Sequence, residues 1–230
     1  MPKHLFIPSQ VNGRRLAISD IHGCNNTFLK LLDKIKLSTS DQLFLLGDYI
    51  NRGGKSLAVI KTIRLLQDEG YQIYFLRGNH EQMVLDVLRR WPLQLKPFLK
   101  KYGSVDLLNK EGQLRSKVFD FLQEGLYYIE LEDYYLVHAG FDCNAEKPLK
   151  SYNKMLTIRK YSPDYEKIAS KQIIHGHVRN SLEKIQTNVL SNKKHFSIDN
   201  GCATKNTLGQ GNLVCLDLDT KELTVQPNIE

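Results

Sequence analysis

Polar residues that can bind metal ions follow five apolar segments of this 230-residue chain. They form five groups: Asp20-Ile21-His22-Gly23, Gly47-Asp48, Gly78-Asn79-His80-Glu81, His138-Ala139-Gly140 and His175-Gly176-His177. Their donors are carboxylate, amide and imidazole groups, with no thiolate among them. Such donors suit Mn, Fe or Zn in a reactive centre better than a structural zinc site, which usually uses cysteine. The chemistry expected of this set is metal-assisted hydrolysis.

Asp48 is the natural candidate for a carboxylate that bridges two metal ions. In two-metal hydrolases the ions lie about 3.5–4 Å apart. Asp48 follows the middle one of three apolar segments that should be strands of one sheet. His175 and His177 both follow the last apolar segment, and the residues alone do not choose between them.

The elements that must position these groups alternate between strand and helix patterns. Over residues 15–90 the expected elements are strands at Arg15–Ser19, Gln42–Leu46 and Tyr71–Leu76 and helices at Asn25–Lys36, Ser56–Glu69 and about Glu81–Arg90. Such a series predicts an α/β fold with parallel strands and helices packed on the sheet. Ligands bind at the carboxyl ends of strands in such a sheet, so the first three polar groups should share that edge.

After residue 90 the predicted secondary structure changes twice, first to short helices and then mainly to strands. Residues 91–125 predict several short helices, because Pro92, Pro97, Gly103 and Gly112 interrupt the pattern. A hairpin is expected from Leu126–Leu131 and Tyr134–His138. Residues 151–171 should be partly helical, and further short strands are expected at Gln172–Ile174, Ile185–Leu190, His195–Ile198, Asn212–Leu218 and Leu223–Val225. We expect one domain, residues 1–230, with a helical insertion at about residues 91–125.

Composition narrows the class of protein. The chain is 41% hydrophobic and 25% charged, as globular proteins are, and no apolar run reaches the roughly 20 residues of a membrane span. The N-terminus lacks the apolar core of a signal peptide, and the four cysteines form no Cys-x-x-Cys pair, which favours a reduced, cytoplasmic protein. A net charge of +7 favours acidic partners. The lysines are scattered and no nucleic-acid motif is present, so neither nucleic acid nor membrane is an expected partner.

The motifs together resemble those of calcineurin-like metallophosphoesterases. The similarity is carried by Asp20-Ile21-His22-Gly23, Gly47-Asp48-x-x-Asn51-Arg52-Gly53 and Gly78-Asn79-His80-Glu81. They are most similar to the serine/threonine protein phosphatase branch, including its bacterial members and the symmetrical diadenosine tetraphosphatases. The later histidine groups and Ile198–Cys202 fit the same pattern, so the resemblance runs from about Leu16 to Thr220. It implies a central β-sandwich flanked by helices on both sides, a four-layer α/β/β/α fold.

The resemblance also implies a role for each residue. One metal would be held by Asp20, His22 and Asp48, and the other by Asp48, Asn79, His138 and His177. The family's ligand follows the glycine, which selects His177 over His175. His80 would be the general acid. Substrate phosphate would be bound by Arg52 and Arg159, with Asn79 beside it. The cofactors would be two divalent ions, Mn first, with Fe or Zn as alternatives.

Asn51 departs from the family pattern. The family usually has an aspartate there, which pairs with the general-acid histidine. The amide oxygen of Asn51 can still accept the imidazole hydrogen bond but carries no charge, so we expect a lower His80 pKa and weaker protonation of the leaving group. Losing such a partner typically costs about 10–100-fold. Asn51 therefore favours good leaving groups, such as those of aryl phosphates or phosphoanhydrides.

The first functional expectation is a phosphomonoesterase similar to serine/threonine protein phosphatases, in which a metal-bridging hydroxide attacks phosphorus directly. Its partner would be a phosphorylated protein, a nucleotide or another phosphate-containing small molecule. The alternative is a dinucleoside polyphosphate hydrolase, which needs an adenine pocket; residues 91–125 would build it, with Trp91, Phe98 and Tyr102 as candidate stacking groups. A non-catalytic binding module is a third interpretation, and only Asn51 favours it.

Overall fold

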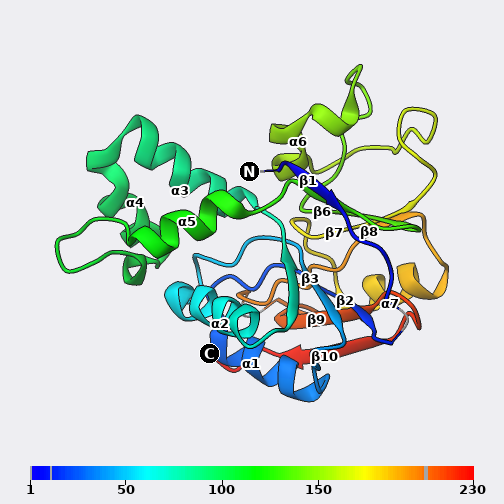
Figure 1. Ribbon diagram of the computed structural model, residues 1–230, viewed down its shortest axis with the longest axis horizontal. Helices are drawn as coiled ribbons and strands as arrows, with labels where there is room; N and C mark the ends of the chain where they lie inside the picture. The colour runs from blue at the N-terminus through cyan, green and yellow to red at the C-terminus, as the bar shows by residue number, and fades with distance from the viewer. Residues whose placement is uncertain (1, 11, 205–206) are drawn as a thin grey trace.

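The computed structural model describes residues 2–10, 12–204 and 207–230, and two five-stranded β-sheets form its centre (Figure 1). The first sheet has the order β10-β9-β2-β3-β4. Its strands are β2 (Arg15–Ile18), β3 (Gln42–Leu45), β4 (Gln72–Phe75), β9 (Asn212–Asp217) and β10 (Leu223–Pro227). The strands β2, β3 and β4 are parallel, as predicted, and β3 lies between the other two.

The second sheet has the order β1-β5-β6-β7-β8. Its strands are β1 (His4–Phe6), β5 (Tyr128–Glu130), β6 (Tyr134–Val137), β7 (Gln172–His175) and β8 (His195–Ser197). The predicted hairpin is present, with Tyr128 opposite Val137 in an antiparallel pair. The strand β1 was not predicted, because three exposed residues give no burial pattern to detect.

Side chains from both sheets meet in one apolar core. Ala17, Phe44 and Leu216 from the first sheet pack in the same cluster as Leu136 and Ile174 from the second, and all five are fully buried. Neighbouring residues of the same strands face the other way, toward the covering helices. Because these strands are buried on both faces, their sequences are continuous apolar runs rather than alternating ones.

Helices cover both outer faces of this pair of sheets (Figure 1). The helices are α1 (Asn25–Lys34), α2 (Ser56–Asp68), α3 (Asn79–Arg90), α4 (Leu95–Tyr102), α5 (Ser116–Glu124), α6 (Tyr152–Thr157) and α7 (Leu182–Leu190). The first two pack on the first sheet, and α6 packs on the second, where Met155 and Leu156 contact the cluster of Tyr135 and Val137. The chain thus has the sandwich of two mixed sheets flanked by helices that the resemblance implied.

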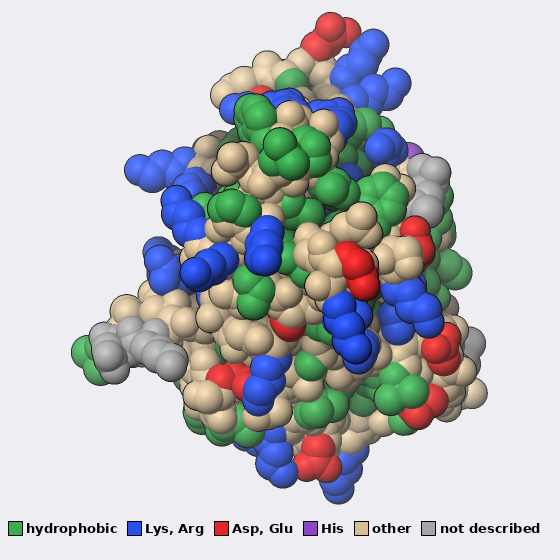
Figure 2. All heavy atoms as spheres, turned by 90° about the vertical axis from the view of Figure 1, so that its left-hand side faces the viewer, with side chains coloured by type: hydrophobic (Ala, Val, Ile, Leu, Met, Phe, Trp, Pro, Cys, Tyr) green, Lys and Arg blue, Asp and Glu red, His purple; other side chains and the backbone are tan. Residues whose placement is uncertain are grey.

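The helices α3, α4 and α5 stand together at one end of the molecule (Figure 1). Short 3₁₀ turns at Pro92–Gln94 and Val105–Leu107 separate them, which matches the expected series of short helices. Figure 2 looks at this end, where Lys and Arg side chains are spread among apolar ones rather than gathered in one block. In the described part of the chain, no helix has the length and apolar character needed to cross a bilayer.

The strand predicted at Ile185–Leu190 is wrong, because this segment belongs to helix α7. The Ser181 hydroxyl caps the helix by accepting a hydrogen bond from the Lys184 N–H. Ile185 and Val189 are buried four residues apart, on one face of the helix. Their β-branched side chains suggested a strand, but the burial of a helical face decides the conformation.

Candidate metal centre

The predicted metal ligands follow strands of both sheets, and their side chains lie close together. Asp20 and His22 follow β2, Asp48 follows β3, and Asn79 begins α3 after β4. The second sheet supplies His138 after β6 and His177 after β7. Two short separations tie this second pair to Asn79: its Oδ1 lies 3.1 Å from Nε2 of His138 and 2.9 Å from Nδ1 of His177. The structure therefore brings together all six residues predicted as metal ligands.

Asp48 lies at the junction of two candidate metal-binding groups. One group contains His22, Asp48 and His80, the other contains Asp48, His138 and His177, and in each the donor atoms lie within 4.8 Å of one another. Asp48 Oδ2 is 3.6 Å from Nε2 of His22, and Asp48 Oδ1 is 3.6 Å from Nε2 of His138. Each oxygen faces a different group, which is the arrangement that a bridging carboxylate needs.

Asp20 places a second carboxylate beside His22 of the first group. Its Oδ1 lies 4.0 Å from Nε2 of His22, and its Oδ2 accepts hydrogen bonds from the Ser19 hydroxyl and from the His177 N–H. His80 also belongs to the first group, with Nε2 4.0 Å from Asp48 Oδ2. His80 is thus placed where it can serve either as a ligand or as a proton donor.

The electrostatics of this cluster fit bound cations. Asp20 and Asp48 are buried, and burial raises the pKa of each carboxyl well above its usual value. Burial lowers the pKa of His22 well below the ordinary value and that of His177 to about 3. Both rings are therefore neutral at pH 7 and can offer a nitrogen lone pair to a metal ion. Nε2 of His177 is buried without a hydrogen-bond partner. Buried carboxylates and an orphaned imidazole nitrogen are what divalent cations would stabilise.

The backbone at the site is held in an uncommon conformation. Left-handed φ angles occur at Asp20 (34°), His22 (51°), Asp48 (56°), Asn51 (73°), Arg52 (74°) and His177 (63°). A left-handed L-residue costs roughly 1–2 kcal/mol, and such residues concentrate where the surrounding structure enforces them for function. Site residues make up six of the nine such non-glycine positions among the described residues.

Glu81 holds two of the site loops together. The side chain is buried, and its carboxylate accepts four backbone hydrogen bonds. Oε2 accepts from Asp48 N (2.9 Å) and Gly78 N (2.9 Å), and Oε1 accepts from Tyr49 N (2.9 Å) and Ile50 N (3.3 Å). The loop after β3 and the turn before α3 are therefore fixed to each other. Glu81 lies in the Gly78–Glu81 motif, but the sequence alone assigns it no role.

Two glycines let the loops approach this closely. A Cβ at Gly78 would collide with the Asp48 carboxylate, and one at Gly176 would collide with the Asp20 carboxylate and the Ser19 hydroxyl. Only glycine, which has no Cβ, allows the backbone to lie this close to the two carboxylates.

A cavity of about 60 Å³, here called the metal hollow, opens above the cluster. Arg52 and Arg159 both line it, so the two arginines predicted to bind phosphate face the same space. Sequence reasoning missed two further lining residues, Arg179 and the buried Asp199. Asp199 lies in the Ile198–Cys202 segment that carried part of the family resemblance, and Arg179 stands two residues after His177, so both had a positional signal.

Asn51 and His80 are hydrogen-bonded as expected, but Asn51 donates the bond through its amide nitrogen instead of accepting it through its oxygen. Asn51 Nδ2 donates to His80 Nδ1 at 2.7 Å, while Asn51 Oδ1 is buried without a partner. Burial, with a smaller contribution from Arg52, lowers the His80 pKa to about 3. Because Nδ1 accepts from Asn51, the neutral His80 ring carries its proton on Nε2. A half-turn of the amide would present Oδ1 instead, which an aspartate could do without turning.

His175 lies apart from the metal cluster. Its ring is buried, Nδ1 donates to the Gly176 carbonyl oxygen at 3.0 Å, and burial lowers its pKa to about 4. It lines a separate cavity of about 500 Å³, which also contains Arg159. The selection of His177 over His175 agrees with this placement.

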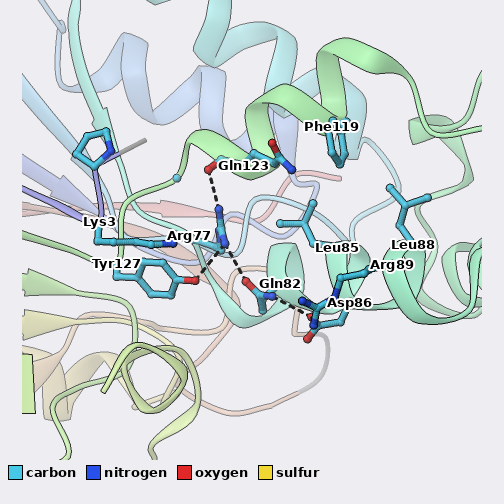
Figure 3. A pocket seen from close by; sticks show the side chains of 12 residues that line it. Lys3, Arg77, Gln82, Leu85, Asp86, Leu88, Arg89, Phe119, Gln123 and Tyr127 are labelled. Carbon is cyan, nitrogen blue, oxygen red and sulfur yellow. Dashed lines mark hydrogen bonds and ion pairs between the residues drawn. The ribbon is translucent and has the colours of Figure 1, made fainter. Parts of the chain in front are cut away.

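Another cavity, of about 600 Å³, lies between α3, α5 and the N-terminal segment (Figure 3). The Arg77 guanidinium stands at its centre and donates to Gln82 Oε1 (2.9 Å), Tyr127 Oη (3.2 Å) and the Gln123 carbonyl oxygen (2.7 Å). No predicted metal ligand lines it.

The candidate stacking groups for adenine are not brought together around a cavity. Trp91 is 57% exposed, whereas Phe98 and Tyr102 pack on each other with ring centroids 4.7 Å apart. Tyr102 also lies edge-on to His80, with centroids 6.0 Å apart. Tyr102 thus contacts a predicted site residue.

Comparison with known proteins agrees with this geometry. The sequence model for calcineurin-like phosphoesterases matches residues 13–203, so the chain belongs to that family. Among curated proteins, the symmetrical bis(5'-nucleosyl)-tetraphosphatase of Nitrosomonas europaea is 33% identical over 125 residues, covering 54% of this chain and 43% of that protein. The chain thus aligns with less than half of that relative's length.

Solved structures share the fold over nearly the whole chain. A crystal structure provisionally assigned as a diadenosine tetraphosphatase superposes with a TM-score of 0.70 at 19% identity, covering 99% of each chain. The cold-active protein-tyrosine phosphatase of a psychrophilic Shewanella superposes with a TM-score of 0.61 at 18% identity, covering 98% of this chain and 82% of that one. At these identities the superpositions establish the fold.

Proposed function

We propose that this chain is a metal-dependent phosphoesterase that hydrolyses dinucleoside polyphosphates. The observation that carries the proposal is the position of Asp48, which is shared by two candidate metal-binding groups and lines a hollow together with three arginines, among them Arg52 and Arg159. A pair of cation sites beside a pair of guanidinium groups is suited to a substrate with several negative phosphates.

The cation sites would be formed as the sequence predicts, by Asp20, His22 and Asp48 on one side and by Asp48, Asn79, His138 and His177 on the other. Divalent ions bound there would neutralise the phosphate and lower the pKa of a water molecule toward neutrality, from about 15.7 in bulk. We propose Mn as the ion, with Fe or Zn as alternatives.

The chain's own groups have distinct tasks in this proposal. The planar guanidinium groups of Arg52 and Arg159 bind nonbridging phosphate oxygens, and each can form two parallel hydrogen bonds. His80 Nε2 lies 3.4 Å from Nη2 of Arg52, so a phosphate bound by Arg52 is within reach of the proton on that nitrogen. In its neutral form His80 would donate a hydrogen bond from Nε2 to the departing oxygen, and proton transfer to that oxygen requires the imidazolium form of the ring.

Two observations favour an anhydride substrate over an alkyl phosphate. The curated relatives that align with this chain are symmetrical tetraphosphatases. In addition, Asn51 gives His80 no negative partner, so the proton donor is weakly supported. A phosphoanhydride leaves as a stabilised anion and needs less protonation than an alkoxide does. This proposal replaces the protein-phosphatase interpretation as the leading one.

A phosphomonoesterase stays the second candidate because of the size of the metal hollow. At about 60 Å³ the metal hollow is far smaller than a nucleotide, so a nucleotide or peptide substrate must extend outside it. A phosphorylated protein would satisfy that condition as well as a dinucleotide.

Substrate assays with Mn²⁺ separate the two candidates. We expect hydrolysis of diadenosine tetraphosphate to ADP, with faster turnover than of a phosphoserine peptide, and p-nitrophenyl phosphate serves as a substrate for both candidates. The Asp48→Asn variant is the inactive control. Turnover of the peptide without turnover of the dinucleotide would establish the second candidate. Absence of all three activities in metal-loaded protein would refute both.

A further inference from the structure

The 500 Å³ cavity beside His175, here called the basic hollow, adjoins the metal hollow through a shared side chain. Arg159 lines both of them. The basic hollow is formed by the segment 159–162, the end of β7, helix α7 and the start of β8. The two hollows are therefore neighbours, with the Arg159 side chain at their common border.

The charges around the basic hollow have one sign. Arg159, Lys160, Lys184 and Lys193 line it, and none of its lining residues is acidic. Among the described residues, no carboxylate oxygen lies within 4.0 Å of any of these four cations. Four cations converging on one concave surface without counter-charges focus a positive potential there. Single lysines are common on protein surfaces. Several of them around one cavity next to a phosphoesterase site favour the binding of a polyanion.

His175 gives the basic hollow a fixed polar group as well. The ring is 6% exposed. Because Nδ1 must donate to the Gly176 carbonyl oxygen, Nε2 is the acceptor nitrogen of the neutral ring. No described protein group donates to Nε2. The Tyr161 ring forms a wall between His175 and His195, with centroid distances of 6.1 Å and 5.4 Å. A hydroxyl group of a ligand would complete the bonding of Nε2.

We propose that the basic hollow binds the part of a polyphosphate substrate beyond the reacting phosphate, with Lys184 and Lys193 contacting the distal phosphates and His175 accepting from a ribose hydroxyl. This inference rests on the proposed function and specifies its substrate-binding site. Arg159 then lies between the reacting phosphate and the distal ones. The small size of the metal hollow is explained, because the remainder of the substrate has its own site.

Charge reversal tests this assignment. Lys184 and Lys193 are exposed, so the double variant K184E/K193E should fold. The matched control is K61E/K117E, which changes the net charge equally at exposed lysines of α2 and α5. With Mn²⁺ we expect K184E/K193E to raise KM for diadenosine tetraphosphate by about tenfold or more, equivalent to about 1.4 kcal/mol. KM for p-nitrophenyl phosphate should change less than about twofold in both double variants, because that substrate ends at the metal hollow.

Calorimetric titration with inorganic tripolyphosphate, with Mn²⁺ in excess over it, gives a readout that is independent of turnover. The expected result is weaker binding by K184E/K193E than by the wild type, with K61E/K117E unchanged. Equal binding by all three proteins would overturn the inference, as would equal increases in the dinucleotide KM for both double variants. If the wild type fails to hydrolyse diadenosine tetraphosphate, the proposed function fails, and the tripolyphosphate titration alone decides whether the basic hollow binds polyphosphate.

Discussion

Replacing Glu81 by glutamine should destabilise the fold and weaken metal binding together. Each carboxylate oxygen of Glu81 accepts two backbone N–H groups. Whichever oxygen becomes an NH₂ group in the variant, two of those donors lose their acceptor and face another donor. Hydrogen bonds to charged groups contribute about 1.5–3 kcal/mol each, so two lost bonds predict a decrease of about 3–6 kcal/mol in the free energy of unfolding.

Urea denaturation followed by circular dichroism, on metal-free protein, measures this decrease. The control is Glu69→Gln, an exposed position after α2, for which a change within about 0.5 kcal/mol is expected. Because Glu81 fixes the loops that carry Asp48 and Asn79, metal affinity measured by calorimetry should fall about 10–100-fold. A loss of stability below about 1 kcal/mol would show that Glu81 does not hold the loops, and the reasoning would be wrong.

Three further predictions concern single side chains. Asp48→Asn should weaken the binding of both metal equivalents, lowering metal affinity and turnover by at least about 100-fold; retention of two tightly bound ions by elemental analysis would rule out the shared ligand. Asn51→Asp should raise turnover of a phosphoserine peptide about 10–100-fold with less effect on an aryl phosphate, because it gives His80 a charged partner, and an unchanged peptide rate would count against that role. Asp41→Asn should cost about 2 kcal/mol at pH 7, because the Arg14 guanidinium and backbone N–H groups lower the Asp41 pKa from 3.8 to about 2. That stabilisation is complete above about pH 4 and disappears as the pH falls through about 2, so denaturation curves of the two proteins should converge there, and a constant difference would contradict the assignment.

The clustering of the candidate metal ligands could be predicted from the sequence because these residues stand at the ends of strands. Apolar runs fix the strands, and parallel strands bring Asp20, Asp48 and Asn79 to one edge without any knowledge of side-chain contacts. The second sheet then delivers His138 and His177 to the same place. The positions of these six candidate ligands follow from the order of the strands together with the sequence motifs. The hydrophobic periodicity of the sequence predicts where the strands and helices lie.

Contacts that depend on the path of loops could not be predicted. Nothing in the sequence shows that Glu81 accepts four backbone N–H groups or that the Asn51 amide turns its nitrogen toward His80. Trp91 was a candidate for stacking, but it is exposed because residues 91–94 cross the surface between two helices. The segment 185–190 was misassigned because β-branched residues fit a strand pattern locally, whereas burial against the sheets makes it helical.

The left-handed backbone of the site restricts how an inactive form of this protein can be made. A replacement for Asp20, Asp48 or His177 must weaken or remove a proposed metal ligand and also accept a positive φ. Asparagine and glycine meet both conditions, whereas valine, isoleucine and threonine would distort the loop and disturb neighbouring ligands. Asparagine variants are therefore the appropriate starting point for capturing a bound substrate in crystals, since they alter the charge of the site while keeping its shape.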